Sequence, residues 1–354
     1  MSVDALSGNV VNDNVVSDNT SLESVDSESS LIDGFNRQIR YLRLSVTDRC
    51  NLRCTYCMAE DMTFLPKSKV LSLEEMVMVA QAFVSLGVEK IRLTGGEPLV
   101  RNGVVDLAGQ LAKLDGLREL VMTSNGVLLD KFAKPLRDAG MSRINISIDS
   151  LREERFKALT RFGDLSDVLR GIDAARDAGF DRIKLNAVIL KGTNNDEVID
   201  LTQFAVDKGL DISFIEEMPL GEIDGHVREH TAIENRSIKE QLESSFTLEQ
   251  SDFNDRASGP SRYLKIANSE TKVGFISPMS DNFCGSCNRV RVTAEGLLLL
   301  CLGNEHSVDL REVVRDDPAK LRTAIIESMQ IKPERHYFDP KDITITRHMS
   351  ATGG

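Results

Sequence analysis

The alternation of short apolar runs with amphipathic stretches constrains the fold of this chain more than any other feature. It begins near residue 38 and repeats six times. The apolar runs predict strands over 41–47, 89–94, 118–123, 143–149, 182–190 and 211–216, and the stretches between them predict helices over 72–86, 102–114, 127–139, 151–159 with 166–178, and 194–208. Ser72 and Glu75 have the spacing of a helix-capping box. Because strands that alternate with helices pair in parallel, we expect an α/β fold built on a partial (β/α)6 TIM-type barrel.

The unusual residues of the chain gather where the predicted strands end. They fall at 50–57, 94–98, 123–126, 149–150, 191–195 and 216–219, one set after each strand. Any one set could be ordinary turn chemistry, since Gly, Asn and Pro punctuate every fold. Active sites of barrels are built at the carboxyl ends of the strands. Six such sets, the first of them rich in cysteine, therefore indicate one shared site.

The strand–helix rhythm stops near residue 220. Beyond it, 222–260 is polar, 263–276 and 289–301 read as antiparallel strands, and 307–330 is helical. The 354 residues are enough for one large barrel or two ordinary domains. We expect a leader over 1–35, a barrel over 36–220, and a C-terminal region over 221–354 that closes the barrel mouth.

Charge and hydropathy exclude several classes of protein. The formal net charge of -12 argues against a general nucleic-acid or anionic-membrane binder. No apolar run approaches the ~20 residues of a membrane span. Seven acids and no Lys or Arg precede Arg37, so the leader is predicted to be disordered. It has neither a secretory pattern nor the arginines of a transit peptide, and we therefore expect a cytoplasmic protein.

The six cysteines form two groups of three. Cys50, Cys54 and Cys57 have the spacing C-x3-C-x2-C, which can wrap one compact metal centre and leave part of it unligated. The alternative is three unrelated cysteines on a loop. Cys284, Cys287 and Cys301 have the spacing C-x2-C-x13-C. An iron–sulfur cluster with an open iron is favoured for the second group, and a zinc site completed by His306 is the alternative.

Cations recur at every second position of several predicted strands. Lys90 and Arg92 share one side of their strand, as do Arg182, Lys184 and Asn186, and as do Arg289 and Arg291. If the apolar neighbours face the helices, these cations point into the barrel, where they need anions. The alternative is that they lie at the rim and pair with carboxylates such as Glu97 or Glu216.

Seven motifs and the terminal Gly353-Gly354 together carry a resemblance to a known family. They are LRLSVTDRCNLRCTYCM, IRLTGGEPLVR, TSNG, RINISIDSL, FIEEMPLG, GPSRY and FCGSCNRVRVTAEGLLLLCL. From about Asp33 onward, the chain resembles the GTP 3′,8-cyclases, the branch of radical S-adenosylmethionine (SAM) enzymes that begins molybdenum-cofactor biosynthesis. The first cysteine spacing alone is typical only of the wider superfamily.

The resemblance implies a set of site residues. Cys50, Cys54 and Cys57 would hold a [4Fe–4S] cluster whose open iron binds SAM, and Cys284, Cys287 and Cys301 would hold a second [4Fe–4S] cluster whose open iron binds the guanine of GTP. SAM contacts are implied at Tyr56, Gly96, Ser147 and Met218, and GTP contacts at Arg43, Lys90, Arg92, Thr123, Lys184, Arg289 and Arg291. Gly353 and Gly354 would reach into the chain's own active site. Two positions depart from the pattern: Ser213 stands where relatives often have Arg, and Thr352 where an apolar residue is expected.

The resemblance also implies a reaction and partners. A 5′-deoxyadenosyl radical made from SAM would remove the C3′ hydrogen of GTP, and the C3′ radical would add to guanine C8. The protein's task would be to position and shield, since the hard chemistry belongs to the cofactors. An external one-electron reductant, cyclic pyranopterin monophosphate synthase as the next enzyme, and a homodimer as one option for assembly follow from the same resemblance.

Two rival interpretations stay open at this point. The first is a radical SAM peptide maturase with an auxiliary cluster, although such regions usually carry more than three cysteines. The second is a zinc-stabilised adaptor, which has no need of converging strand-end motifs. For the Gly-Gly end, a carrier-like tail is the alternative to insertion, and no small β-grasp pattern precedes it.

Overall fold

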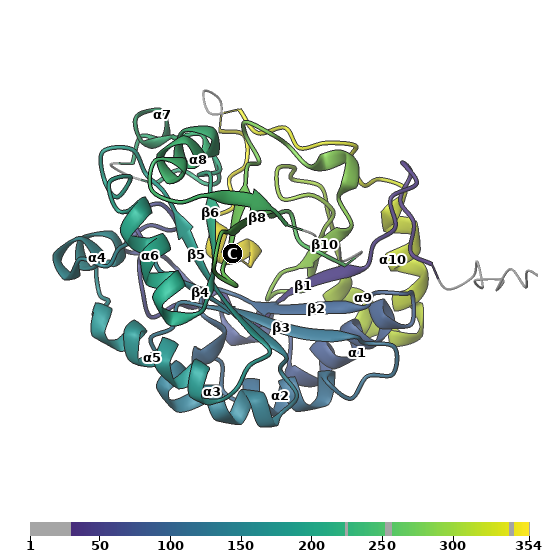
Figure 1. The fold of residues 1–354 in the computed structure, drawn as a ribbon. Helices are drawn as coiled ribbons and strands as arrows, with labels where there is room; N and C mark the ends of the chain where they lie inside the picture. Colours follow the sequence, from purple (N-terminus) through teal and green to yellow (C-terminus); the bar gives the residue numbers. More distant parts are fainter. Residues whose placement is uncertain (1–29, 224–225, 252–256, 340–342, 354) are drawn as a thin grey trace, which may run out of the picture.

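The computed structural model describes residues 30–223, 226–251, 257–339 and 343–353. Most of the predicted leader (1–29) and Gly354 lie outside these residues. The described strands form one strongly curved sheet with helices on its outer side (Figure 1). No helix in this part of the chain combines the length and the apolar character needed to cross a bilayer.

Six strands with helices between them form the first part of the sheet, as the periodicity predicted. They are β1 (Tyr41–Ser45), α1 (Leu73–Val84), β2 (Lys90–Thr94), α2 (Val104–Leu111), β3 (Glu119–Ser124), α3 (Leu129–Asp138), β4 (Arg143–Ser147), α4 (Glu153–Thr160) with α5 (Leu165–Asp177), β5 (Arg182–Val188), α6 (Val198–Lys208) and β6 (Asp211–Ile215). All neighbouring pairs from β1 to β6 are parallel. The predicted capping box of Ser72 and Glu75 is present at the start of α1. The fold class of a partial TIM-type barrel is confirmed.

The C-terminal part of the chain extends this sheet at both edges. Its elements are α7 (Arg228–Thr231), α8 (Asn235–Glu243), β7 (Leu248–Gln250), β8 (Arg262–Ile266), β9 (Lys272–Ile276), β10 (Arg289–Val292), β11 (Leu297–Leu299), β12 (Ser307–Asp309), α9 (Leu310–Asp316), α10 (Leu321–Met329) and α11 (Met349–Thr352). The predicted antiparallel pairs are β8 with β9 and β10 with β11. In addition, β9 pairs in parallel with β6, and β10 in parallel with β1.

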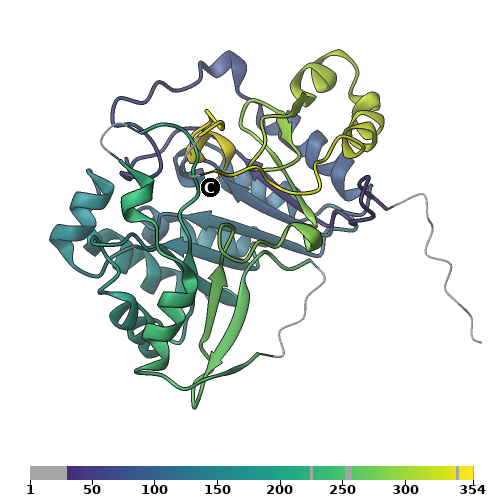
Figure 2. The ribbon, with the colours of Figure 1, turned by 90° about the horizontal axis from the view of Figure 1, so that it is seen from above.

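These additions leave the barrel open on one side. The strand order runs from β12 through β10, β1 to β6 and β9 to β7, and no ladder among the described residues joins its two ends. The loop 277–288 carries the chain from β9 on one flank to β10 on the other. The C-terminal strands therefore extend the wall of the barrel, whereas α11 lies inside the curve of the sheet, at the mouth of the barrel (Figure 2). The division at residue 220 stays a prediction, since strands from both sides of it share this sheet.

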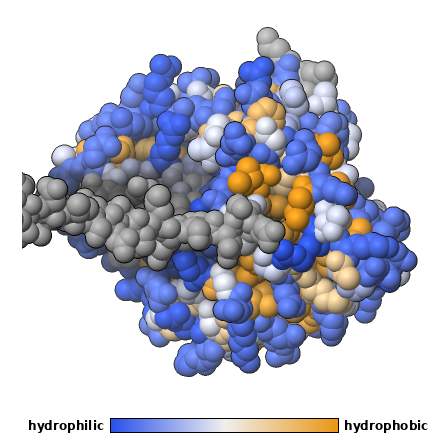
Figure 3. Space-filling model, turned by 90° about the vertical axis from the view of Figure 1, so that its right-hand side faces the viewer, coloured by the Kyte–Doolittle hydropathy of each residue, from blue (hydrophilic) through white to orange (hydrophobic). Residues whose placement is uncertain are grey.

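The core lies between the sheet and the helices. In β5 the side chains of Ile183, Leu185 and Ala187 are buried against the helices, and the alternate residues face the inside of the curve. This alternation follows from the two-residue period of a strand. A second apolar area is solvent-exposed: orange atoms gather on the face near α10 (Figure 3), where the exposed large side chains include Ile326 and Ile331.

Candidate active site

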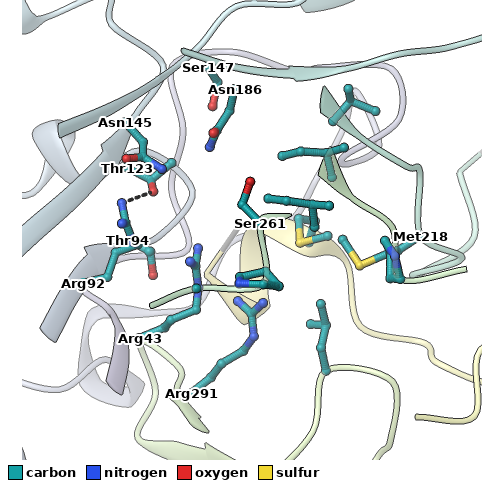
Figure 4. A pocket seen from close by; sticks show the side chains of 18 of the residues that line it. Arg43, Arg92, Thr94, Thr123, Asn145, Ser147, Asn186, Met218, Ser261 and Arg291 are labelled. Carbon is teal, nitrogen blue, oxygen red and sulfur yellow. Dashed lines mark hydrogen bonds between the residues drawn. The ribbon is translucent and has the colours of Figure 1, made fainter. Parts of the chain in front are cut away.

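One cavity collects the predicted site residues. It is lined by both cysteine groups and by all the SAM and GTP contacts implied by the resemblance: Tyr56, Gly96, Ser147, Met218, Arg43, Lys90, Arg92, Thr123, Lys184, Arg289 and Arg291. Figure 4 shows Arg43, Arg92 and Arg291 directed into the same space from three different strands. The roles assigned to these residues stay predictions, but their convergence on one cavity is a finding.

The two cysteine groups lie at opposite ends of β1. The loop with Cys50 follows the carboxyl end of this strand. At its amino end, the backbone N–H groups of Arg40 and Tyr41 donate to the carbonyl of Asn288, the residue after Cys287. A five-residue strand is roughly 17 Å long. The cavity therefore spans the distance between the two groups, with one at the mouth and the other near the base.

The first cysteine group is half-buried and weakly hydrogen-bonded. Burial raises the pKa of Cys50 to about 11 and the pKa of Cys57 to about 12, and it raises the pKa of Cys54 well above its usual value. Asn125 Nδ2 lies 3.7 Å from Cys50 Sγ. Thiols with raised pKa values become thiolates when a metal takes the proton's place. The donor set thus fits a metal group rather than three packed thiols.

The second cysteine group lies in more basic surroundings. Burial acts to raise the pKa of Cys287, but the charges of Arg289 and Lys332 act more strongly in the other direction, so the pKa ends below its usual value. Among the described residues, no group of three or more His, Cys, Asp or Glu side chains could hold a single metal ion. The same holds for the first cysteine group, so this finding does not separate a zinc site completed by His306 from an iron–sulfur cluster, and the preference for a cluster stays a prediction.

Cations at the base of the barrel are neutralised within the protein. Lys90 Nζ lies 2.6 Å from Glu119, which also pairs with Arg143. Arg182 pairs with Asp211 in the same way. The pairing of these cations with carboxylates was foreseen as an alternative. The carboxylates foreseen, Glu97 and Glu216, are wrong, because they accept backbone N–H groups instead.

A second set of cations has no carboxylate partner. In the part of the chain that the structure describes, none of Arg43, Arg92, Lys184, Arg289 and Arg291 has an ion pair within 4.0 Å. Two of them donate to side-chain hydroxyl groups: Arg92 Nη1 to Thr123 Oγ1 at 3.1 Å, and Lys184 Nζ to Tyr263 at 3.0 Å. The dashed line in Figure 4 marks the first of these bonds.

The excess of positive charge changes the ionisation of groups within the cavity. At Tyr41 burial acts to raise the pKa, but the charges of Arg92, Arg43 and Lys90 lower it to about 6. Burial, reinforced by the charges of Arg43 and Arg289, lowers the pKa of Arg291 well below its usual value. Buried cations that perturb one another in this way create a binding site for a polyanion, and guanidinium groups match phosphate oxygens in pairs.

The carboxyl ends of β2 and β4 combine close backbone approach with a buried carboxylate. A Cβ on Gly96 would lie 2.7 Å from the carbonyl oxygen of Asp48, so only glycine fits there. Tyr56 donates its hydroxyl proton to Asp149 Oδ2 at 2.7 Å, and the backbone N–H of Val188 donates to Asp149 Oδ1 at 2.8 Å. Burial raises the pKa of Asp149 to about 6. Sequence reasoning placed Asp149 at a strand end but gave it no role.

The C-terminal segment enters the cavity and contacts the free cations. The carbonyl oxygen of Gly353 accepts from Arg291 Nη1 at 2.9 Å and from Arg43 Nη2 at 3.0 Å. Gly353 has φ +78°, and a Cβ there would overlap Thr94 Oγ1. Thr352 is buried, and its hydroxyl donates to the carbonyl of Met349 at 3.0 Å. This bond explains how a polar residue is accommodated at the unexpected position.

Comparison with known proteins identifies first the class and then the family. Residues 44–205 match the family model described as Radical SAM superfamily, and residues 210–338 match Molybdenum Cofactor Synthesis C. A crystal structure of Streptococcus suis SuiB bound to S-adenosylmethionine shares the fold, with a TM-score of 0.55 at 16% identity over 82% of this chain and 69% of that one. The superfamily implies a [4Fe–4S] cluster and SAM.

Curated relatives extend this match to nearly the whole chain. The GTP 3′,8-cyclase of Pseudomonas putida (strain W619) is 59% identical over 92% of this chain and 98% of its own length. The GTP 3′,8-cyclase of Saccharophagus degradans is 55% identical over 92% and 99%. The chain belongs to the GTP 3′,8-cyclase family of radical SAM enzymes.

Proposed function

We propose that the protein converts GTP to its 3′,8-cyclo nucleotide by radical SAM chemistry, the first step of molybdenum-cofactor biosynthesis. The ribose C3′–H bond is broken and a C3′–C8 bond to guanine is formed; the radical then left on the guanine takes up one electron from the external reductant and one proton. The observation that supports this most directly is the position of the two cysteine groups at opposite ends of β1, with unpaired cations between them. The names of the relatives and the Molybdenum Cofactor Synthesis C match support the same reaction.

The first cysteine group holds the superfamily's [4Fe–4S] cluster, and we assign a second [4Fe–4S] cluster to Cys284, Cys287 and Cys301. When bound, the first cluster and SAM supply a 5′-deoxyadenosyl radical that removes a hydrogen atom from C3′. Gly96 would allow the backbone to approach SAM closely, and Ser147 and Met218, which line the same cavity, would contact it. The bond from Tyr56 to Asp149 ties the loop of the first cysteine group to the end of β4, and would hold the aromatic ring in place beside the bound cofactors.

The unpaired cations bind and orient the substrate. Arg43, Arg92 and Arg291 come from three adjacent strands, so their spacing is set by the sheet rather than by flexible loops. They offer the planar donors that triphosphate oxygens accept. Lys90 contributes less to this set, because Glu119 already pairs with it. The Ser213 hydroxyl hydrogen-bonds to the Ser261 hydroxyl at 3.0 Å. Ser213 therefore holds the segment that carries Ser261 against β6, and it adds no positive charge to the cavity.

The wider setting follows from the reaction. The product passes to cyclic pyranopterin monophosphate synthase, and an external one-electron reductant supplies the first cluster. A reducing cytoplasm suits six free cysteines, none of which forms a disulfide. A homodimer is retained as one option for assembly.

The test is an anaerobic assay of reconstituted protein with SAM, reductant and GTP labelled with deuterium at C3′. We expect deuterium in 5′-deoxyadenosine, a cyclised nucleotide, and about eight irons per chain. Arg291→Met should abolish product formation, whereas Arg315→Met, which removes a solvent-exposed guanidinium paired with Glu75, should not. Unlabelled 5′-deoxyadenosine and unchanged GTP from iron-loaded protein would instead favour the peptide-maturase interpretation.

A further inference from the structure

Lys332 is a buried cation whose charge the protein itself does not neutralise. It lies three residues after α10 and is 2% exposed. Its ammonium donates to the carbonyl oxygen of Leu300 at 2.8 Å, and it lies 3.7 Å from Cys287 Sγ. Within the described ranges, no carboxylate comes within 4.0 Å of it. Lys90, the other deeply buried lysine of the cavity region, has Glu119 as its partner.

A buried ammonium with only a carbonyl partner is costly, because its lost hydration is not replaced by an opposite charge. The neighbouring cation shows the usual solution: Arg37 pairs with Asp33 and also donates to the carbonyl of Cys284 at 2.8 Å. Arg289 instead stacks its guanidinium 4.8 Å from the ring of Phe283. Among these three cations around the second cysteine group, Lys332 alone donates to a sulfur atom.

The missing anion has a natural candidate in the proposed second cluster. A [4Fe–4S] core held by three thiolates carries a net negative charge, and reduction by one electron makes this charge more negative. Hydrogen bonds to the sulfur atoms and nearby charge are the main means by which a protein sets the potential of such a cluster. Lys332 supplies both a hydrogen bond and a positive charge to one cluster ligand, the sulfur of Cys287.

We propose that Lys332 sets the reduction potential of the second cluster, by donating an N–H···S hydrogen bond to the Cys287 thiolate and by stabilising the more negative, reduced state. It acts through the ligand and not on the substrate, so it is a positioning residue. The same ammonium joins the Leu300 carbonyl, next to Cys301, to the C-x2-C loop. This inference rests on the second cluster that forms part of the proposed function.

The test measures the potential directly. Full-length protein with Cys54→Ala, reconstituted anaerobically, leaves only the second cluster, and its reduction is followed by electron paramagnetic resonance in a potentiometric titration. In that background Lys332→Met should lower the ratio of reduced to oxidised cluster at a fixed potential at least tenfold, about 59 mV for a one-electron couple. Lys332→Arg, which keeps the charge, should change it less than threefold. Lys320→Met removes a lysine from the same region whose side chain is 66% exposed, and should change nothing.

If Lys332→Met cannot retain the second cluster, its potential cannot be measured. A second measurement, the unfolding temperature of iron-free protein, then tests the proposal. In iron-free protein the ammonium has no counter-ion, so Lys332→Met should unfold at the same or a higher temperature than the parent. A purely structural lysine would give a lower unfolding temperature through its lost bond to Leu300, and that result would overturn the proposal. An unchanged potential with iron retained would also overturn it. Iron missing from the Cys54→Ala parent itself would refute the second cluster, which is a different failure.

Discussion

Gly353→Ala tests whether the C-terminal segment is held in the cavity by close backbone approach. Gly353 adopts φ +78°, in the left-handed region, and a Cβ would overlap Thr94 Oγ1 and lie 3.2 Å from Ser45 Cβ. Its carbonyl is fixed by Arg43 and Arg291, so the residue cannot shift without lengthening these bonds. The substitution therefore combines a backbone penalty with a steric one.

The two penalties have separate sizes. A residue with a Cβ costs about 1–2 kcal/mol in the left-handed region. Overpacking a well-filled site adds about 1–3 kcal/mol. A total near 3 kcal/mol corresponds to roughly a hundredfold fall in the ratio of docked to undocked segment. Gly209→Ala is the matched control, because Gly209 has φ +67° but no atom within 4 Å of an added Cβ.

Amide hydrogen exchange of the segment 343–353, measured by mass spectrometry, reports the docked fraction. We expect roughly hundredfold faster exchange in Gly353→Ala and no change there in Gly209→Ala. The double variant Gly353→Ala with Thr94→Ala removes the overlap with Thr94 Oγ1, so it should regain the part of the protection against exchange that is lost to this steric overlap. Equal protection in the single variant and the parent would show that the close approach does not hold the segment, and the reasoning would fail.

Two further predictions concern the charges of the cavity. Tyr41 has a pKa of about 6 in the folded protein, against 10.0 in the unfolded chain. Its ionised form should therefore stabilise the fold increasingly as pH rises from 6 toward 10, and this stabilisation should disappear as pH falls through 6. Carbon-13 NMR of labelled tyrosine should show one ring that titrates near pH 6, and this signal should be absent in Tyr41→Phe. Lys90→Met should lower the free energy of unfolding, but by less than the about 3–5 kcal/mol that breaking a fully buried pair costs, since the half-buried Glu119 keeps Arg143 as its remaining partner. Denaturant unfolding measures the effect, and a stability equal to the parent would show that Arg143 alone suffices.

Local pattern was enough to predict the six strand–helix repeats, because strand and helix periods differ and each repeat is encoded within about 30 residues. The cysteine spacings were informative for the same reason. The pairing of β10 with β1 was not predictable in this way, since its partners lie about 250 residues apart. Lys332 was missed because nothing near it in the sequence signals Cys287, and Lys90 was assigned to the substrate because its partner Glu119 comes from the next strand.

The pairing of β1 with β10 has a consequence for the biosynthesis of this protein. One edge of β1 is covered by β2 soon after synthesis, but its other edge has no partner until residues 289–292 have been made. At ~5–20 residues per second, that edge waits about 12–50 s. An unpaired strand edge is a template for aggregation during this time. β10 follows directly after Cys284 and Cys287, so a nascent chain acquires the partner of this edge together with the first two cysteines of its second group, and Cys301 follows nine residues later.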